Sequence, residues 1–271
     1  MLRPLALLIL ALLIVPGAKA QDTIRLARYA GNLKQVTVRI GDSSYRLLFD
    51  TGGGDTFLSP RIAAALGKPV YGEATTFRMS GEPVRYQRCD SVRAQIGGRA
   101  YFFPSVGVWD LMSILPKGLP PIDGVLSLRS FAGAAISIDL AQELLIVETR
   151  ASLRRRTQKM TLLGSRFATG PAGNELSVFL QLLHGGRPFW FLFDSGNLRD
   201  VLLSPATAKA WNINADSAGH VPGPVPLSLG GRSFTESAGV EPIIYDGALN
   251  FRFLSSRVFT LDLARYRVWM N

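Results

Sequence analysis

The sequence predicts an all-β protein with two or more short helices, arranged as two similar halves. Segments in which apolar and polar residues alternate, such as 35–40 (QVTVRI), are separated by turn residues, and the chain contains 27 Gly and 16 Pro. Alternation of this kind is typical of strands with one buried face, and Gly and Pro mark turns. Helix signals are few and short. The same order of short motifs also occurs twice along the chain, which predicts two related lobes.

The amino terminus has the pattern of a secretory signal peptide. Arg3 precedes the apolar run from Leu5 to Val15, and Ala18-Lys19-Ala20 resembles a cleavage site with small residues. The run is shorter than the ~20 residues that span a bilayer. We therefore expect residues 1–20 to be a signal peptide and the protein to be periplasmic or secreted, with no integral membrane span after cleavage. An amino-terminal anchor that is not cleaved is the alternative.

Composition limits the classes of function. About 250 residues follow the signal segment, enough for one large domain or two small ones. Cys89 is the single cysteine, so no internal disulfide can form, and we expect it to be a small buried apolar residue. The formal net charge is +10, with the densest basic run at 154–156, which we interpret as a solvated linker. A basic surface attracts anionic partners, but no nucleic-acid-binding motif accompanies it, and we expect no nucleic-acid partner.

The first repeated element is an apolar strand that ends in Asp, a hydroxyl residue and Gly. It reads LLFDTG at 47–52 and FLFDSG at 191–196. Each copy is followed by Leu-Ser-Pro and an Ala-rich segment, 61–66 in the first half and 206–211 in the second. Ser followed by Pro is a typical helix start, so we predict a short helix at each place.

The second repeated element is Asp-Gly-apolar-Leu, followed by two strands that form a hairpin. Its segments are 122–126, 136–140 and 144–147 in the first half, and 246–249, 258–263 and 266–269 in the second. Residues 151–173 have no clear periodicity. We therefore divide the mature chain into an amino-terminal lobe at 21–152, an interlobe linker at 153–173 and a carboxy-terminal lobe at 174–271.

The chemistry of the two Asp motifs follows from their residue types. A carboxylate at the end of a buried strand can stand in a cleft, and the following Gly permits a tight turn and the close approach of another chain. The hydroxyl residue can hold the opposing loop by a hydrogen bond. Asp50 and Asp194 are thus the candidate catalytic pair, which could activate water without metal or cofactor. The expected supporting residues are Thr51, Gly52, Ser195 and Gly196.

These motifs resemble the two signatures of the aspartic protease superfamily of pepsin-like and retropepsin-like enzymes, and the resemblance covers roughly residues 36–269. It implies a two-lobed acid-protease β-barrel fold with pseudo-twofold symmetry and a flap over the site. We place the flap hairpin at 78–86, with Ser80, Gly81 and Tyr86 as candidate flap residues. The chain departs from the family pattern at Ser127 and Asn250, where the family often has Gly, and at Asn197, where a small residue is commoner.

The resemblance implies an aspartic endopeptidase that cleaves a peptide or protein substrate. Two motifs on one chain remove the need to dimerise, so we expect a monomer. The first alternative is a catalytically inactive peptide-binding module of the cell envelope. The second is an envelope assembly protein that uses the basic run at 154–156.

Other reactive residue types do not form a recognisable site. His184 and His220 lack a ligand pattern, so we expect no metal and no cofactor. No Gly-x-Ser-x-Gly motif is present, and no Gly-Lys-Ser/Thr follows the glycines at 52–54. We interpret Asp55 and Asp200, which lie near the motifs, as turn or surface carboxylates. The four Trp residues are interpreted as core or cleft-wall aromatics.

Overall fold

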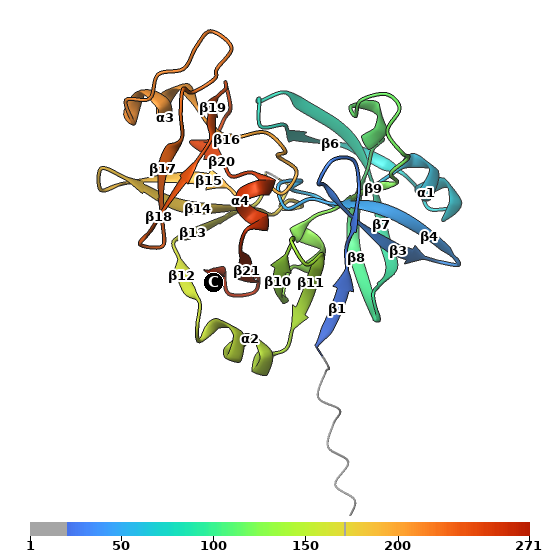
Figure 1. Cartoon of the computed structure of the whole chain (residues 1–271). Helices are drawn as coiled ribbons and strands as arrows, with labels where there is room; N and C mark the ends of the chain where they lie inside the picture. The colour runs from blue at the N-terminus through green and yellow to red at the C-terminus, as the bar shows by residue number, and fades with distance from the viewer. Residues whose placement is uncertain (1–20, 171) are drawn as a thin grey trace, which may run out of the picture.

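The computed structural model describes residues 21–170 and 172–271, and the predicted signal peptide lies outside them. The described chain is mostly β, which confirms the predicted fold class, and forms two lobes joined by a sheet at their base (Figure 1). Within these residues, no helix combines the length and apolar character needed to cross a membrane.

The first lobe is an eight-stranded sheet. In spatial order its strands are β2 (Ala27–Arg28), β3 (Lys34–Ile40), β4 (Ser43–Phe49), β9 (Gly124–Leu126), β5 (Phe57–Leu58), β8 (Arg99–Val108), β7 (Pro83–Ile96) and β6 (Tyr71–Phe77). An additional pairing between β3 and β7 closes the sheet on itself. Alternate residues of β3 are buried, as its sequence predicted.

The second lobe repeats this plan. Its strands in spatial order are β18 (Arg232–Glu236), β17 (Val225–Leu229), β14 (Ser177–His184), β15 (Arg187–Leu192), β20 (Gly247–Ala248), β16 (Val201–Leu203) and β19 (Ala238–Val240), with β13 (Ser165–Ala168) paired to β14. In both lobes, the strand before the Asp of the first repeated element pairs in parallel with the strand of the Asp-Gly-apolar element. These pairs are β4 with β9 and β15 with β20. The predicted repeat is therefore a structural repeat.

A six-stranded sheet joins the lobes. Its strands are β1 (Asp22–Arg25), β11 (Leu144–Glu148), β10 (Ala135–Asp139), β21 (Val258–Asp262), β22 (Arg267–Met270) and β12 (Thr161–Leu163). The two predicted hairpins are β10–β11 and β21–β22, and β10 pairs antiparallel with β21 across the lobes. The two halves thus share one sheet.

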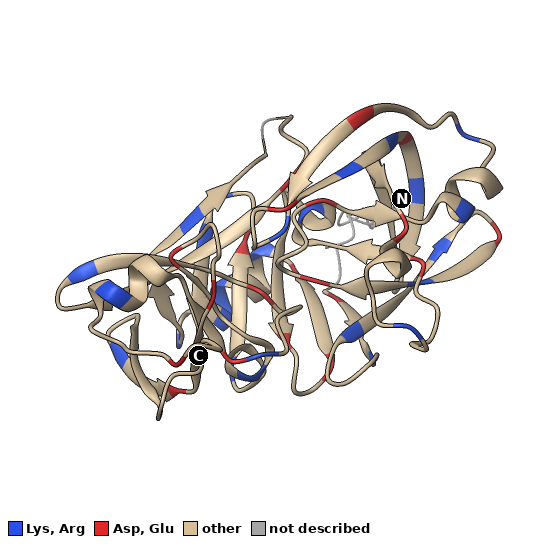
Figure 2. Ribbon diagram, turned by 90° about the horizontal axis from the view of Figure 1, so that it is seen from above, with Lys and Arg blue, Asp and Glu red and all other residues tan. Residues whose placement is uncertain are grey.

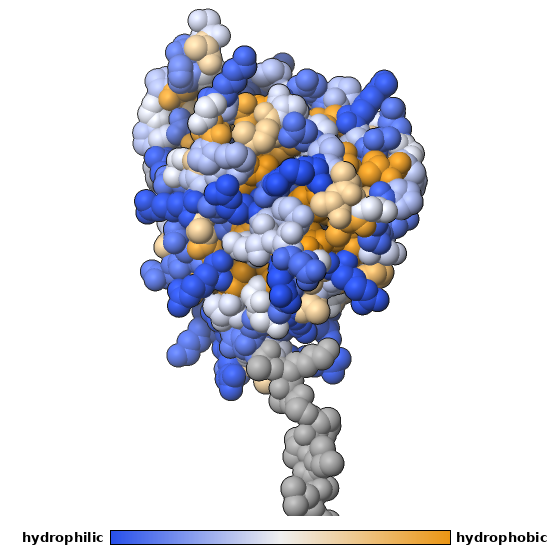
Figure 3. Space-filling view, turned by 90° about the vertical axis from the view of Figure 1, so that its right-hand side faces the viewer, coloured by the Kyte–Doolittle hydropathy of each residue, from blue (hydrophilic) through white to orange (hydrophobic). Residues whose placement is uncertain are grey.

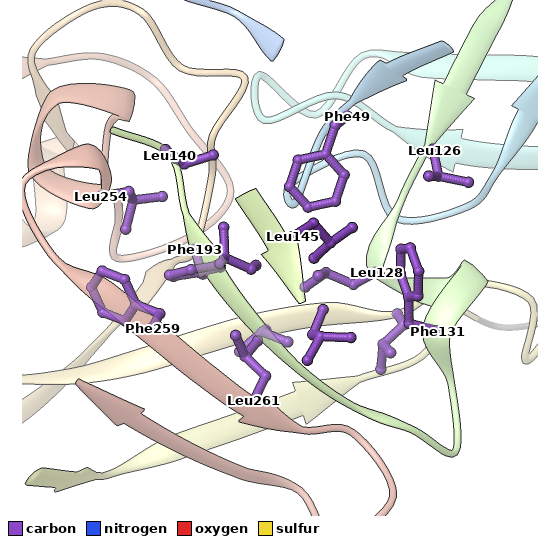
Figure 4. Close-up of a cluster of buried hydrophobic side chains, with 14 of the residues drawn as sticks. Phe49, Leu126, Leu128, Phe131, Leu140, Leu145, Phe193, Leu254, Phe259 and Leu261 are labelled. Carbon is purple, nitrogen blue, oxygen red and sulfur yellow. The ribbon is translucent and has the colours of Figure 1, made fainter. Parts of the chain in front are cut away.

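The core extends from this sheet to the strands that carry the Asp motifs. Phe49 and Phe193, each directly before an Asp, are 1% exposed and contribute to the same buried cluster (Figure 4). The rings of Phe193 and Phe259 are 5.0 Å apart at their centroids. Apolar contacts from both lobes therefore support the ends of β4 and β15 from below.

The helices are short. They are α1 (Pro60–Ala65), α2 (Arg150–Thr157), α3 (Pro205–Ala210) and α4 (Phe251–Ser255), with 3₁₀ turns at Leu111–Ser113 and Leu128–Phe131. The two Ser-Pro helices, α1 and α3, form where predicted. At α3 the Ser204 side chain accepts a hydrogen bond from the Thr207 N–H, whereas Ser59 of α1 makes no such bond. Asn250, one of the departures from the family pattern, caps α4 by accepting from the Phe253 N–H.

The basic run at 154–156 lies on α2, whose start is fixed by a capping box between Thr149 and Ser152. Arg154 and Arg155 are exposed to solvent. Arg156 donates from Nε to the buried Glu148 carboxylate at 2.5 Å. Lys and Arg are otherwise distributed over both lobes (Figure 2), and on the face of the first lobe hydrophilic and apolar residues are intermixed (Figure 3).

Candidate active site

Asp50 and Asp194 stand at equivalent places in their motifs, just beyond the strand that leads to the centre of each lobe. Asp50 follows β4, and its N–H donates to the Leu126 carbonyl of β9 at 3.2 Å. Asp194 lies two residues beyond the end of β15, where the Leu249 N–H donates to the Leu192 carbonyl at 2.9 Å. The parallel strand in each lobe therefore holds the backbone from which the carboxylate projects.

The two carboxyl groups face each other. A Cβ placed on Gly196 would lie 2.9 Å from both oxygens of Asp50 and 3.1 Å from Oδ1 of Asp194, so both groups surround one point. A Cβ on Gly52 would lie 2.5 Å from Oδ1 of Asp194. Each Gly also donates its N–H to the Asp of its own motif, at 2.9 Å from Gly52 and 2.8 Å from Gly196. Glycine is required here because any side chain would occupy the space of the carboxylates.

The environment raises the pKa of both groups. Burial raises the pKa of Asp194 well above its ordinary value, and the negative charge of Asp50 raises it further. Burial also raises the pKa of Asp50, while hydrogen bonds from Gly52, Asp194 and Gly196 partly offset that rise. Two carboxylates at hydrogen-bond distance cannot both ionise easily. The pair therefore holds one proton between its two members over a pH range in which isolated aspartates would be ionised.

Thr51 and Ser195 connect the two Asp loops to each other. The Thr51 hydroxyl donates to the Phe193 carbonyl at 2.7 Å and accepts from the Ser195 N–H at 2.9 Å. The Ser195 hydroxyl accepts from the Thr51 N–H at 3.0 Å. Both side chains are almost completely buried. These three bonds across the lobes fix the separation of the two carboxyl groups.

A pocket of about 310 Å³ contains the pair. The first lobe supplies an apolar wall formed by Leu33, Leu48, Phe57, Trp109, Leu111, Ile114, Leu115 and Val125. Residues from the second half of the chain include Glu175, Ser177, Leu192 and Tyr245. The site therefore combines an acid pair with a mainly apolar wall on one side. Pockets that bind organic ligands typically have such a lining, with a few polar groups among apolar side chains.

The β6–β7 hairpin covers one side of this pocket. Its tip is closed by the Arg78 N–H, which donates to the Glu82 carbonyl at 2.9 Å, so Ser80 and Gly81 lie at the tip as predicted. The Ile244 N–H of the second lobe donates to the Met79 carbonyl at 2.9 Å. The hairpin therefore reaches across the pocket and contacts the opposite lobe.

Tyr86 lies on β7 within this hairpin, but its side chain is not among the residues that line the pocket. It is 3% exposed, and its ring packs edge-on against Phe57 with centroids 4.9 Å apart. Its hydroxyl accepts a hydrogen bond from Asn174 Nδ2 at 2.7 Å. The alternation of side chains along β7 turns Tyr86 toward the interior of the lobe.

Comparison with known proteins agrees with this geometry. Residues 36–128 match the family model described as aspartyl protease. The sequence of this part of the first lobe is therefore similar to aspartyl proteases. No curated protein has a significantly similar sequence.

Two solved structures resemble this chain over nearly its full length. One is conglutin gamma, a basic 7S globulin from lupine seeds, with 10% identity, a TM-score of 0.58, and coverage of 93% of this chain and 94% of that chain. The other is basic 7S globulin from soybean, with 9% identity, a TM-score of 0.57 and the same coverage. At these identities the likeness shows the fold alone.

Asp55 is a buried residue of this aspartic-protease-like site, not the turn or surface carboxylate that we expected. It is 1% exposed and pairs with Arg88 at 2.8 Å. Asn174 Nδ2 donates to the same oxygen at 3.1 Å. Burial raises the pKa of Asp55, and the hydrogen bond and charge of Arg88 partly offset that rise. The sequence shows a Gly-Gly-Asp turn there but carries no signal that a partner lies on a distant strand.

The remaining residues considered from the sequence lie outside the acid pair. Asp200 is exposed, as predicted, and Cys89 is buried with its pKa raised by that burial. Within residues 21–170 and 172–271, no three His, Cys, Asp or Glu side chains gather as a set of metal ligands. Trp109 lines the pocket, and Trp211 lies in the core, stacked on His184.

Proposed function

We propose that this protein is an aspartic endopeptidase in which Asp50 and Asp194 activate one water molecule. The observation that supports this most strongly is the convergence of the two carboxyl groups on one point beside Gly196, at the bottom of a pocket. The shared proton is the second requirement, because one member of the pair must act as base while the other acts as acid.

In the proposed reaction, a peptide lies extended beneath the β6–β7 hairpin. The ionised carboxylate of the pair takes a proton from water, and the water oxygen attacks the peptide carbonyl carbon. The protonated carboxyl group donates a hydrogen bond to the carbonyl oxygen and stabilises the tetrahedral intermediate. A proton then passes to the leaving nitrogen as the C–N bond breaks. The titration belongs to the pair, so neither Asp alone is assigned as the acid.

The substrate and setting are part of the proposal. The substrate is a peptide or protein segment, and the protein acts as a monomer because both Asp motifs lie on one chain. The signal-like residues 1–20 support a periplasmic or secreted location. The proposed lobes at 21–152 and 174–271 each supply one carboxylate.

A peptide-binding module without catalysis is the alternative. The two similar structures described above are named as globulins, not as peptidases, which supports keeping this alternative. Both proposals place an extended peptide in the same pocket. They differ in whether the bound peptide is cleaved.

The test is a peptidase assay at acid pH with and without a peptide that carries statine in place of the scissile residue. A peptidase is expected to cleave unlabelled protein and peptide pools and to be inhibited by the statine peptide, because statine places a hydroxyl group where the attacking water would lie. Binding of the statine peptide without any cleavage would reject the endopeptidase proposal and support the binding module.

A further inference from the structure

The pocket contains a carboxylate that the proposed reaction does not use. Glu175 lies just before β14 and lines the pocket together with Asp50 and Asp194. It is only partly exposed. None of the ion pairs formed by residues 21–170 and 172–271 includes it. A partly buried carboxylate without a paired cation is costly unless a ligand supplies the charge.

Hydrogen bonds hold the residues on both sides of Glu175. Asn174 donates from Nδ2 to Asp55 at 3.1 Å, and the Leu176 N–H donates to the Gly54 carbonyl at 3.1 Å. The carboxylate rests against Gly170, where a Cβ would come within 2.8 Å of Oε2 of Glu175. The segment is thus held to the loop that carries Asp50, and the acid group has a defined place in the pocket before any ligand binds.

The charges around the pocket favour a cation. Besides Glu175, its lining residues with acidic or basic side chains are Asp50, Asp194 and Arg78, and Tyr245 adds a phenol whose pKa is raised by burial. Arg78 lies on the hairpin and pairs with Glu82 at 3.3 Å. A pocket with this balance attracts positive charge although the chain as a whole has a net charge of +10. The overall charge of the protein therefore does not predict the charge of its ligand.

We propose that Glu175 is a specificity-determining residue that binds a Lys or Arg side chain of the substrate, close to the scissile bond. This inference rests on the proposed function. The apolar wall of the first lobe would take a large apolar side chain on the other side of that bond. The preferred substrate is thus a peptide in which an apolar and a basic residue flank the cleaved bond.

Thr76 on β6 also lines the pocket, and its side chain partly offsets the rise that burial causes in the pKa of Glu175. A purely structural role, in which Glu175 holds the hairpin closed, would use this polar contact with β6 and not the charge. Two variants separate the roles. Glu175→Gln keeps the size and a hydrogen-bond acceptor but removes the charge. Thr76→Val removes the hydroxyl group on β6 but leaves the charge of Glu175.

The experiment uses pairs of peptides that differ at one position, where one peptide has Lys and the other has norleucine. One pair carries this change just before the cleaved bond and another carries it just after. One set carries a cleavable bond and is measured as kcat/KM. The other set carries an uncharged hydroxyethylene group in place of that bond and is measured as Kd by calorimetry at about pH 7. Burial raises the pKa of Glu175, so neutral pH favours its carboxylate form more than the acid pH of the peptidase assay does. We expect the Lys peptide to be favoured about tenfold at one position, as for a charge-assisted hydrogen bond.

In Glu175→Gln, the Lys and norleucine peptides are expected to have equal kcat/KM and equal Kd values. In Thr76→Val, the preference for the Lys peptide is expected to remain. Equal values for Lys and norleucine in the parent protein, or a ratio that survives in Glu175→Gln, would overturn the assignment. If norleucine peptides are cleaved without any preference for Lys, the specificity assignment fails while the peptidase proposal stands. If the hydroxyethylene peptides do not bind and no peptide is cleaved, both fail.

Discussion

Asp50 and Asp194 have raised pKa values because burial disfavours their charge and because each lies beside the other. A group whose folded-state pKa is raised contributes stability below its unfolded-state pKa and loses that contribution as pH rises through the folded-state pKa. The pair therefore costs stability at neutral pH. For the same reason, kcat/KM is expected to fall as pH rises through the upper apparent pKa of the pair, where the shared proton leaves.

The hydrogen bonds of Thr51 and Ser195 predict that the two hydroxyl groups contribute unequally to stability. The Thr51 hydroxyl makes two of the three bonds and the Ser195 hydroxyl makes one. A buried hydrogen bond contributes about 1 kcal/mol. We expect Thr51→Ala to lower the free energy of unfolding by about 2 kcal/mol and Ser195→Ala by about 1 kcal/mol, measured by urea denaturation.

Thr51→Ser is the matched control, because it keeps the hydroxyl group and should stay close to the parent stability. Equal losses for Thr51→Ala and Ser195→Ala would contradict the unequal roles that the structure gives to the two hydroxyl groups.

At the residue scale, the sequence located the residues that local motifs mark and missed those that depend on the fold. Asp50 and Asp194 could be found because each lies in a repeated motif. Asp55 and Glu175 could not, since their settings are created by residues far away in sequence, such as Arg88 for Asp55. The inward direction of the Tyr86 side chain could not be predicted, because the register of β7 cannot be read from its residues alone.

Strand β7 connects the flap hairpin to the loop below the acid pair. Its residue Arg88 pairs with Asp55, whose side chain is 1% exposed. Arg85 lies on the same strand, but its pair with Glu73 is exposed and longer, at 3.7 Å. Strand β7 therefore carries one buried ion pair, Arg88–Asp55, and one exposed ion pair, Arg85–Glu73.

We expect Arg88→Met to destabilise the protein by about 3 kcal/mol or more, because it leaves a buried carboxylate without its cation. Arg85→Met is the control and should change stability by less than about 1 kcal/mol. The double variant with Asp55→Asn should lose less than the sum of its single changes. Thermal or urea unfolding that shows additive losses would indicate that Arg88 and Asp55 do not act as a pair.

At the element scale, the strands and hairpins were predictable and two helices were not. The alternation at 35–40 and the apolar runs of the two final hairpins matched their strands. Helix α2 was not predicted because its run of Arg has no apolar face. Helix α4 has only five residues, too few for a periodic signal, and its start depends on Asn250.

The six-stranded sheet makes the two lobes one folding unit. Strands β10 and β21 pair across the lobes, and the buried Ser137 hydroxyl contacts Thr260 Oγ1 at 2.8 Å and donates to Glu148 at 2.7 Å. Because the strands that carry both Asp residues rest on this shared base, the geometry of the site depends on the whole molecule. The repeated hairpins predicted two lobes, but the sequence could not show that the hairpins join in one sheet.

We expect Ser137→Val to lower the stability of both lobes together, by roughly 1–3 kcal/mol, because it leaves buried polar groups without a partner. Hydrogen exchange of the β4 and β15 amides is the measurement, and protection of both strands should fall by the same amount. Ser44→Val, at an exposed position of β4, is the control. A loss of protection confined to β4 would mean that the lobes unfold independently.

The central claim is that Asp50 and Asp194 act as one unit on one water molecule. The most direct measurement is the rate of peptide cleavage by the parent protein, by Asp50→Asn, by Asp194→Asn and by the double variant. The account predicts that each single change lowers kcat by about 10³-fold or more and that the double change adds little further loss, as for residues that act together. Cleavage at the parent rate by either single variant would contradict it.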